Sequence, residues 1–324
     1  MMIFKTPDFC EAAKLSEIYS LRNNKTCDST VLDTYIWKSY YNTKVWIEDD
    51  SAALLLMQNE DEFFSAMPYC REEKLKDYFY KLQDYFNGVL GKPLKIYLAD
   101  EDALELLDLK NDDNYLVREE PDLKDYLYDA EELRSLAGKK YQKKRNLVNK
   151  FKKEYEGRWE YKTLCCSDEY FLETFMNRWV SSKQEDNTES LDTLLYEKDG
   201  VIDILRNCDK LTFTVGGIFI DDVLEAFSIG SYNKKEKMVV ISIEKGNSAI
   251  PGIYQAINQL FLQNSYPDAV YVNREDDMGI DGLRQAKESY NPIGYARKYM
   301  VLQKNFSDST DNMTDYYESE IARR

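Results

Sequence analysis

The sequence contains no histidine among its 324 residues. This absence excludes a Ser-His-Asp triad, a Cys-His couple, a histidine general base and a zinc site with histidine ligands. If the chain catalyses a reaction, its general base must therefore be a carboxylate. No spacing of candidate ligands indicates a metal centre, and we expect none.

Long apolar runs are also absent. Ala52–Met57 is one of the longest, and it is far shorter than the roughly 20 residues that cross a bilayer. The N-terminal segment lacks the apolar stretch and small-residue cleavage site of a secretion signal. The six cysteines include no CxxC pair, and we expect them to be reduced thiols. These absences predict a cytoplasmic chain without a transmembrane segment.

Positive charge is scarce. Lysine and arginine number 43 against 59 acidic residues, which gives a net charge of −16. Such a chain binds nucleic acid or an anionic membrane only through a local basic patch. One patch exists, because residues 139–153 include eight basic residues and no acidic one. In a helix predicted over 129–154, Lys140 and Lys144 fall in the middle of the apolar stripe and Arg145 falls at its edge.

Two interpretations of this basic helix stay open. A charge run usually forms a solvated helix face. A lysine on a core-facing stripe, in contrast, must either extend its ammonium to solvent or meet an anion. A break of the helix at Gly138 would decouple its two parts and weaken the second interpretation.

The length suggests about two domains, and the hydrophobic periodicity divides the chain into two halves with the same order of elements. Each half predicts an antiparallel three-strand meander, then a helix, a strand, a short helix and a further strand. We therefore expect a domain at 1–128, a linking helix at 129–154, a second domain at 155–306 and a mobile tail at 307–324.

Polar groups gather around the predicted helix over 252–264. A strand ends at Glu244-Lys245, a polar loop follows, and Pro251-Gly252 opens the helix. Backbone N–H groups at such a loop and helix N-terminus can bind an anion or a carbonyl oxygen. Gln255 and Asn258 lie off the apolar stripe of this helix. An ordinary strand-to-helix turn with a solvated helix face has the same pattern.

A second polar segment follows the strand that ends at Asn273. Arg274–Asp277 come directly after it, and loops beyond strand ends are where α/β folds bind ligands. The alternative is a solvated acidic turn with helix-surface ion pairs around Arg284. Tyr290, which precedes a turn, could donate a proton or simply cap the core.

Three strings resemble the signature of a bacterial family described as phosphatidylglycerol lysyltransferase C-terminal-like: DAEELRSLAGKKYQKKRNLVNKF, EKGNSAIPGIYQAINQLF and NREDDMGIDGLRQAKESYNP. The resemblance implies an α/β (α+β) architecture of tandem GNAT acyltransferase domains, with mixed central sheets flanked by helices. The basic helix is similar to the inter-domain helix of the Fem peptidyltransferases, which implies aminoacyl-tRNA as donor. Gly252 matches one glycine of the GNAT pyrophosphate loop, but the arginine and second glycine of that loop are missing.

These observations predict an acyl- or aminoacyltransferase. It would move an activated group from aminoacyl-tRNA or a coenzyme A thioester to an amine or hydroxyl. The expected base is Glu275 or Asp277, then Glu244, and the expected acid is Tyr290. The predicted substrate-binding residues are Lys245, Gln255, Asn258, Asn273, Arg274, Arg284 and Lys287. The predicted donor-binding residues are Lys140, Lys144, Arg145 and Gly252.

The alternative is a catalytically silent GNAT-like module that binds a metabolite. The incomplete pyrophosphate loop favours this alternative, whereas the segment 273–287 is compatible with both. The sequence leaves the donor, the acceptor and the oligomeric state open.

Overall fold

The computed structural model describes residues 2–60, 62–186, 190–304 and 306, and the predicted tail lies outside this part of the chain. Its first half contains, in order, α1 (Ala12–Tyr19), α2 (Val31–Trp37), β1 (Lys44–Glu48), β2 (Ala52–Asn59), β3 (Glu62–Phe64), β4 (Tyr69–Cys70), α3 (Leu75–Tyr85), β5 (Lys95–Asp100), α4 (Glu101–Leu107) and β6 (Tyr115–Glu119).

A second group of elements begins with β7, which lies within the expected domain 1–128 except for its last residue. Its elements are β7 (Asp125–Asp129), α5 (Ala130–Ser135), α6 (Gln142–Glu154), β8 (Trp159–Leu164), α7 (Glu169–Asp186), α8 (Leu191–Arg206), β9 (Thr214–Ile220), β10 (Val223–Asn233), β11 (Met238–Gly246), α9 (Ile253–Ser265), β12 (Tyr271–Asn273), α10 (Asp281–Glu288), β13 (Gly294–Ala296) and β14 (Lys298–Gln303). The expected α/β fold with mixed sheets flanked by helices is confirmed.

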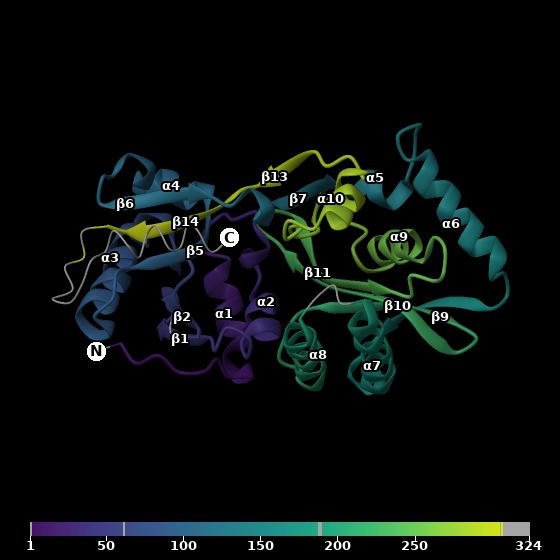
Figure 1. The fold of residues 1–324 in the computed structure, drawn as a ribbon, viewed down its shortest axis with the longest axis horizontal. Helices are drawn as coiled ribbons and strands as arrows, with labels where there is room; N and C mark the ends of the chain where they lie inside the picture. Colours follow the sequence, from purple (N-terminus) through teal and green to yellow (C-terminus); the bar gives the residue numbers. More distant parts are fainter. Residues whose placement is uncertain (1, 61, 187–189, 305, 307–324) are drawn as a thin grey trace.

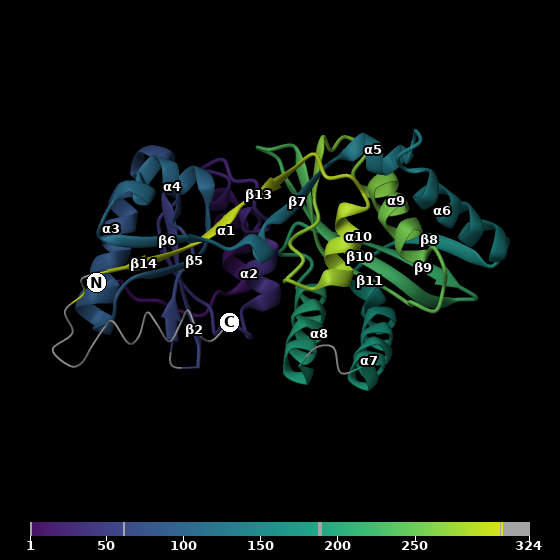
Figure 2. The same ribbon diagram turned by 45° about the horizontal axis from the view of Figure 1, so that its top comes forward.

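The two halves exchange one strand each. In the second half β7 lies between β12 and β13, in a seven-stranded sheet of order β13-β7-β12-β11-β10-β9-β8. In the first half β14 lies between β5 and β6, and Figure 2 shows it in yellow on the left-hand side of the molecule. A strand of the expected domain 1–128 thus pairs in the second-half sheet, and a strand of the expected domain 155–306 pairs in the first-half sheet.

Helices cover both faces of the seven-stranded sheet. α9 packs on one face with α5 and α6 beyond it, and α7 and α8 pack on the other face (Figure 1). α9 is consequently buried on nearly all sides: Ile253, Ile257 and Phe261 have no exposed surface, and its polar Asn258 is 1% exposed.

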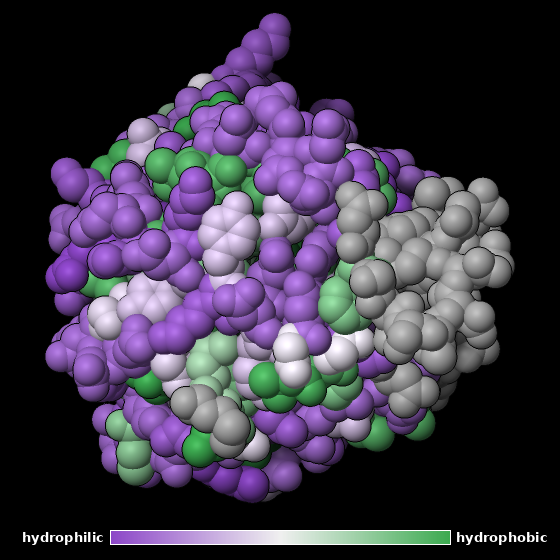
Figure 3. All heavy atoms as spheres, turned by 90° about the vertical axis from the view of Figure 1, so that its left-hand side faces the viewer, coloured by the Kyte–Doolittle hydropathy of each residue, from purple (hydrophilic) through white to green (hydrophobic). Residues whose placement is uncertain are grey.

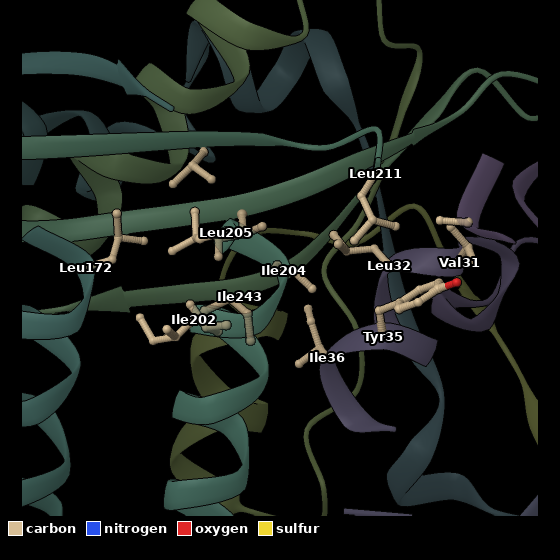
Figure 4. Packing of buried hydrophobic residues seen from close by; sticks show 14 of the residues in the cluster. Val31, Leu32, Tyr35, Ile36, Leu172, Ile202, Ile204, Leu205, Leu211 and Ile243 are labelled. Atoms are coloured by element: carbon tan, nitrogen blue, oxygen red, sulfur yellow. The ribbon is translucent and has the colours of Figure 1, made fainter. Parts of the chain in front are cut away.

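The largest hydrophobic cluster joins the halves. Leu32 and Ile36 of α2 pack against Ile204 and Leu205 of α8 (Figure 4). Burial of such side chains stabilises the contact by about 1.5–3 kcal/mol each, so we expect the two halves to form one rigid unit.

The basic segment is not a single helix, and the expectation of one over 129–154 is wrong. Asp129 caps α5 by accepting a hydrogen bond from the backbone N–H of Glu132. Leu136 and Gly138 then take left-handed φ values of 48° and 81°, and α6 begins only at Gln142. Because an α-helix cannot continue through left-handed residues, the chain turns between α5 and α6.

Two further observations concern the cysteines and the surface. Cys166 and Cys208 form a disulfide, so the expectation of six reduced thiols is wrong for this pair. No described helix is both long and apolar enough to cross a bilayer. The face of the first half in Figure 3 is mostly hydrophilic, and its hydrophobic side chains are scattered rather than gathered.

Candidate functional site

The candidate site lies where two neighbouring strands diverge. β11 pairs in parallel with β12 only from Met238 to Val240. Directly beyond this stretch the register of β11 against β10 shifts, so that Ile241 and Ile243 face consecutive residues of β10 and Ser242 forms a bulge. A bulge bends its strand and re-aims the side chains after it. The residues of β11 beyond the bulge are therefore no longer paired with β12.

A buried ion pair connects β11 with the segment after β12. The Nη2 atom of Arg274, just after β12, lies 2.6 Å from Oε1 of Glu244 on β11. Both side chains are close to 90% buried, at 12% and 11% exposed. The other oxygen of Glu244 accepts hydrogen bonds from Asn258 Nδ2 of α9 at 2.9 Å and from Ser228 Oγ of β10 at 3.3 Å. We call Glu244, Arg274, Asn258 and Tyr290 the Glu244–Arg274 site.

Three polar atoms around this pair have no hydrogen-bond partner within the described residues. They are Arg274 Nη1, Asn258 Oδ1 and the Tyr290 hydroxyl, and all three are buried. The Tyr290 ring lies 4.7 Å from the centre of the Arg274 guanidinium. Burial raises the pKa of the Tyr290 hydroxyl, and the neighbouring Arg274 and Gln255 oppose this rise only in part. Buried donors and acceptors are almost always paired, so this group is suited to a polar ligand.

Of the predicted donor-binding residues, Lys144 is the one that the described contacts bring to the site. Its ammonium donates to Ser289 Oγ and lies 4.0 Å above the Tyr290 ring. Burial, and secondarily the nearby Arg274 charge, lowers the pKa of Lys144 to about 8. A second positive group therefore adjoins the site without a carboxylate partner among the described residues.

Lys140 and Arg145 are engaged elsewhere. The ammonium of Lys140 is ion-paired with Glu132 at 2.6 Å. The guanidinium of Arg145 donates to the carbonyl oxygens of Leu136 and Gly138. Arg145 therefore holds the turn between α5 and α6, and the helix break explains why the predicted common stripe does not form.

Gly252 is required by packing against α6. Its φ is 86°, and a Cβ at this position would overlap the carbonyl oxygen of Leu147 on α6. α6 therefore lies over the start of α9, where the GNAT pyrophosphate loop was expected. In the preceding loop the backbone N–H groups of Asn247, Ile250 and Ile253 already donate to backbone carbonyls. These three N–H groups are therefore not free to bind an oxyanion, which was the role predicted for this loop.

Lys245 faces away from the site. Side chains alternate along a strand, so Lys245 points to the face opposite Glu244. Its ammonium pairs with Glu197 of α8 at 2.8 Å and lies 3.9 Å from the Trp179 ring of α7. The expectation that Lys245 binds substrate together with Glu244 is therefore contradicted by strand geometry.

Asp277 and Arg284 form an ion pair with each other. Asp277 has no exposed surface and accepts hydrogen bonds from Arg284, from the Tyr126 hydroxyl and from the Gly279 backbone N–H. Burial alone would raise the pKa of Asp277, but these hydrogen bonds lower it to about 2. Such a carboxylate is a weak proton acceptor at neutral pH, which argues against Asp277 as the general base. Arg284 also pairs with Asp122, as an internal ion pair rather than a substrate ligand.

Glu275, Asn273 and Lys287 belong to a second polar group between the halves. We call it the interhalf acid cluster, and its ionisable members are Cys27, Asp28, Asp33, Asp125, Glu275, Asp276, Lys287 and Lys298. Asn273 donates from its amide to Asp125 at 3.0 Å. The ammonium of Lys287 donates to the backbone carbonyls of Arg274 and Asp276. Burial, then the nearby Asp33, raises the pKa of Glu275 well above its usual range.

Sequence reasoning missed the members of this cluster that come from the first half and from the exchanged strands. Asp125 and Lys298 lie far along the chain from each other and from Cys27 and Asp33. Lys298 offered one signal, because it is a charged residue at the start of the apolar segment KYMVLQ. In the structure it is 1% exposed. Within the described residues, atoms able to hold a metal ion come together in one group, Cys27, Asp33 and Glu275.

Comparison with known proteins gives one family. The family model for phosphatidylglycerol lysyltransferase, C-terminal, matches residues 19–302. A curated relative, an uncharacterised protein of Mycoplasmoides gallisepticum, is 26% identical over 206 residues, which is 64% of each chain. The match thus spans just under two thirds of that relative's length.

Solved structures show the same fold. A conserved protein of unknown function from Bacteroides thetaiotaomicron superposes with a TM-score of 0.85 at 24% identity, over 94% of this chain and 100% of that one. L-PGS from Bacillus licheniformis gives 0.66 at 15% identity, over 100% and 98%. A tandem GNAT protein from the clavulanic acid biosynthesis pathway gives 0.51 at 8%, over 95% and 99%. The expected tandem GNAT-like fold is confirmed.

Proposed function

The chain belongs to the phosphatidylglycerol lysyltransferase C-terminal family, and from this premise we propose that it is an aminoacyltransferase. It would move an aminoacyl group from aminoacyl-tRNA to an amine or hydroxyl acceptor at the Glu244–Arg274 site. The observation that carries the proposal is the set of three unpartnered buried atoms, Arg274 Nη1, Asn258 Oδ1 and the Tyr290 hydroxyl.

These atoms complement an aminoacyl ester. The α-ammonium group would be held by Asn258 Oδ1, which accepts hydrogen bonds. The free Nη1 of Arg274 would donate to the ester carbonyl oxygen and stabilise the negative charge that develops there.

The chemical step is an acyl transfer that balances without a cofactor. The acceptor nitrogen or oxygen attacks the ester carbon and loses a proton, and the bond from that carbon to the ribose oxygen of tRNA breaks. Tyr290 would protonate the leaving ribose oxygen. Glu244 is the carboxylate at the site and would accept the acceptor's proton, because Glu275 lies with Cys27 and Asp33 and Asp277 is held by Arg284.

The features around α6 support tRNA rather than coenzyme A as the donor. The carbonyl of Leu147 fills the space over Gly252 where a pyrophosphate would approach. The exposed lysines of α6 form no ion pair within the described residues: Lys143, Lys150 and Lys153. Such a face attracts phosphates and loses affinity as salt rises. Aminoacyl-tRNA is a cytoplasmic species, so the proposal also places the chain there.

The test measures transfer of a radiolabelled amino acid from charged tRNA. The purified chain is incubated with tRNAs charged with single amino acids, and label is followed into phosphatidylglycerol vesicles or into soluble amines. Arg274→Lys keeps the charge beside Glu244 but removes the second N–H group, and we expect transfer to fall about 100-fold. Arg284→Lys is the matched control and should leave transfer within a few-fold of wild type.

The outcome also decides against the alternative. Transfer that depends on Arg274 supports the enzyme. Saturable binding of aminoacyl-tRNA or a free amino acid without transfer supports the silent binding module. Equal loss of transfer in both variants would contradict the assignment of the site to Arg274.

A further inference from the structure

The interhalf acid cluster has more negative than positive charge. Its carboxylates are Asp28, Asp33, Asp125, Glu275 and Asp276, against the two ammonium groups of Lys287 and Lys298. The Lys298 ammonium forms an ion pair with the Asp125 carboxylate at 2.7 Å. The carboxylates of Asp28 and Asp276 lie 3.6–3.7 Å from the same ammonium. Neither Asp33 nor Glu275 forms an ion pair with a described residue. A buried carboxylate without a partner either takes up a proton or binds a cation. Burial raises the pKa of both Asp33 and Glu275, so a cation bound here would displace their protons.

The surroundings of Asp33 also indicate a bound cation, independently of the number of charges in the cluster. It is 9% exposed, and neither of its carboxylate oxygens has a hydrogen-bond partner among the residues that the structure describes. The Ser242 hydroxyl, on the bulge of β11, is near enough to lower the pKa of Asp33. It too has no hydrogen-bond partner among the described residues. An ionised carboxylate accepts several hydrogen bonds or binds a metal ion when it is buried.

Cys27 adds a soft ligand. Its sulfur is buried and accepts a hydrogen bond from the Lys298 ammonium at 3.0 Å. Burial raises the pKa of the Cys27 thiol, and the Lys298 ammonium only partly opposes this rise. A metal ion that binds here would displace the thiol proton and bind the thiolate. The combination of one thiolate with two carboxylates is within the ligand set of Zn²⁺, and histidine is not required for it.

We propose that Cys27, Asp33 and Glu275 bind a Zn²⁺ ion between the two halves. One ligand atom of each lies within 4.8 Å of the others. With bonds of about 2.0–2.3 Å, the ligand atoms of one tetrahedral zinc ion lie about 3.3–3.7 Å apart, so the three side chains would have to close in by about 1 Å to bind it. Water would take the fourth position.

The site would join the halves. Cys27 and Asp33 come from the segments before and within α2, and Glu275 follows β12 of the second half. A metal that binds only the folded chain stabilises it in proportion to the logarithm of its free concentration. This inference does not depend on aminoacyl transfer, because its readouts are metal content and stability.

The experiment uses the full chain, stripped with a chelator and titrated with Zn²⁺ against a chromophoric competitor. We expect one Zn²⁺ per chain and a melting temperature that rises with Zn²⁺. With Co²⁺ in place of Zn²⁺, a thiolate-to-cobalt charge-transfer band should appear, and Cys27→Ser should remove it. Cys165→Ser, which changes an exposed free thiol, is the matched control and should keep the band.

Asp33→Asn makes the test independent of misfolding. It removes an unpartnered buried charge and should therefore fold at least as well as wild type. We expect its Zn²⁺ affinity to fall at least tenfold. The proposal is overturned if the chain binds no Zn²⁺ stoichiometrically. It is also overturned if Cys27→Ser and Asp33→Asn bind Zn²⁺ as tightly as the wild-type chain, since the ion would then lie elsewhere.

Discussion

Asp125 and Lys298 begin the two strands that the halves exchange, and their side chains form an ion pair 2.7 Å long where these strands cross. Asp125 has no exposed surface and Lys298 is 1% exposed. β7 carries Asp125 into the second-half sheet, and β14 carries Lys298 into the first-half sheet. The pair therefore fixes the point at which each half depends on the other.

Lys298→Met should strongly destabilise the chain. The substitution leaves the Asp125 carboxylate buried among other acids without its ammonium partner, which typically costs about 3–5 kcal/mol. The measurement is the free energy of unfolding in urea. Adding Asp125→Asn to Lys298→Met should restore part of the loss, because the stranded charge is then gone. Lys74→Met, in the exposed pair with Asp77, should change the free energy by less than about 1 kcal/mol. Equal effects of Lys298→Met and Lys74→Met would contradict a buried pair.

Gly200→Ala should loosen the contact between the halves. A Cβ at position 200 of α8 would overlap the carbonyl oxygen of Ile36 at the end of α2. Because that neighbour is backbone, the helices must separate, and overpacking of this kind costs about 1–3 kcal/mol. Thermal unfolding measures it. Gly282→Ala, whose Cβ meets no atom within 4 Å, should be neutral or stabilising by up to about 1 kcal/mol. A neutral Gly200→Ala would show that α2 and α8 are not this close.

Tyr290→Phe should separate activity from stability. The Tyr290 hydroxyl has no hydrogen-bond partner in the described part of the chain, so its removal should leave the free energy of unfolding unchanged or slightly higher. If the hydroxyl protonates the leaving group, aminoacyl transfer from charged tRNA should fall about 100-fold.

Tyr126→Phe provides the converse control. The Tyr126 hydroxyl donates to the Asp277 carboxylate at 2.5 Å, and loss of a hydrogen bond to a charged group costs about 1.5–3 kcal/mol. Stability should therefore fall while transfer by the folded fraction persists. Unchanged transfer in Tyr290→Phe would exclude this hydroxyl from the reaction.

Much of the fold could be predicted because it follows from local sequence patterns, namely hydrophobic periodicity and turn residues. The antiparallel three-strand meander predicted in each half is present as β1-β2-β3 and as β9-β10-β11. The break after Ser135 could not be predicted with certainty, since Leu136 takes a left-handed conformation that few leucines adopt. Gly138 was the available signal.

The candidate site was predicted only in part for a different reason. Glu244, Arg274, Asn258 and Tyr290 were on the predicted list, but their pairing depends on the bulge at Ser242, which no periodicity reveals. Asp33 was missed because it meets Glu275 only after the halves assemble. Contacts between segments more than 200 residues apart leave no trace in a single sequence.

Lys144→Met should stabilise the chain below about pH 8, and the gain should fade in alkali. In the folded chain burial and Arg274 lower the pKa of Lys144 to about 8, from 10.5 in the unfolded chain. Folding therefore disfavours its ammonium form, and this cost is fully present below pH 8 and disappears as pH rises through 10.5. Methionine has a similar shape and no charge. Urea unfolding at pH 7 and pH 10 should show a clear gain for the variant at pH 7 and a smaller one at pH 10. Because Lys144 is only half buried, solvent screening limits the size of the gain.

Lys140→Met is the matched control on the same segment. Lys140 is exposed and paired with Glu132, so its replacement should give no gain that depends on pH. The same two variants test the proposed donor. If Lys144 contacts a phosphate or the ester of aminoacyl-tRNA, Lys144→Met should weaken binding about tenfold, as expected for one charge-assisted contact of about 1.5 kcal/mol. A more stable Lys144→Met chain with unchanged affinity for aminoacyl-tRNA would show that this lysine is only a strained neighbour of Tyr290. A less stable one would mean that Lys144 has a carboxylate partner in solution.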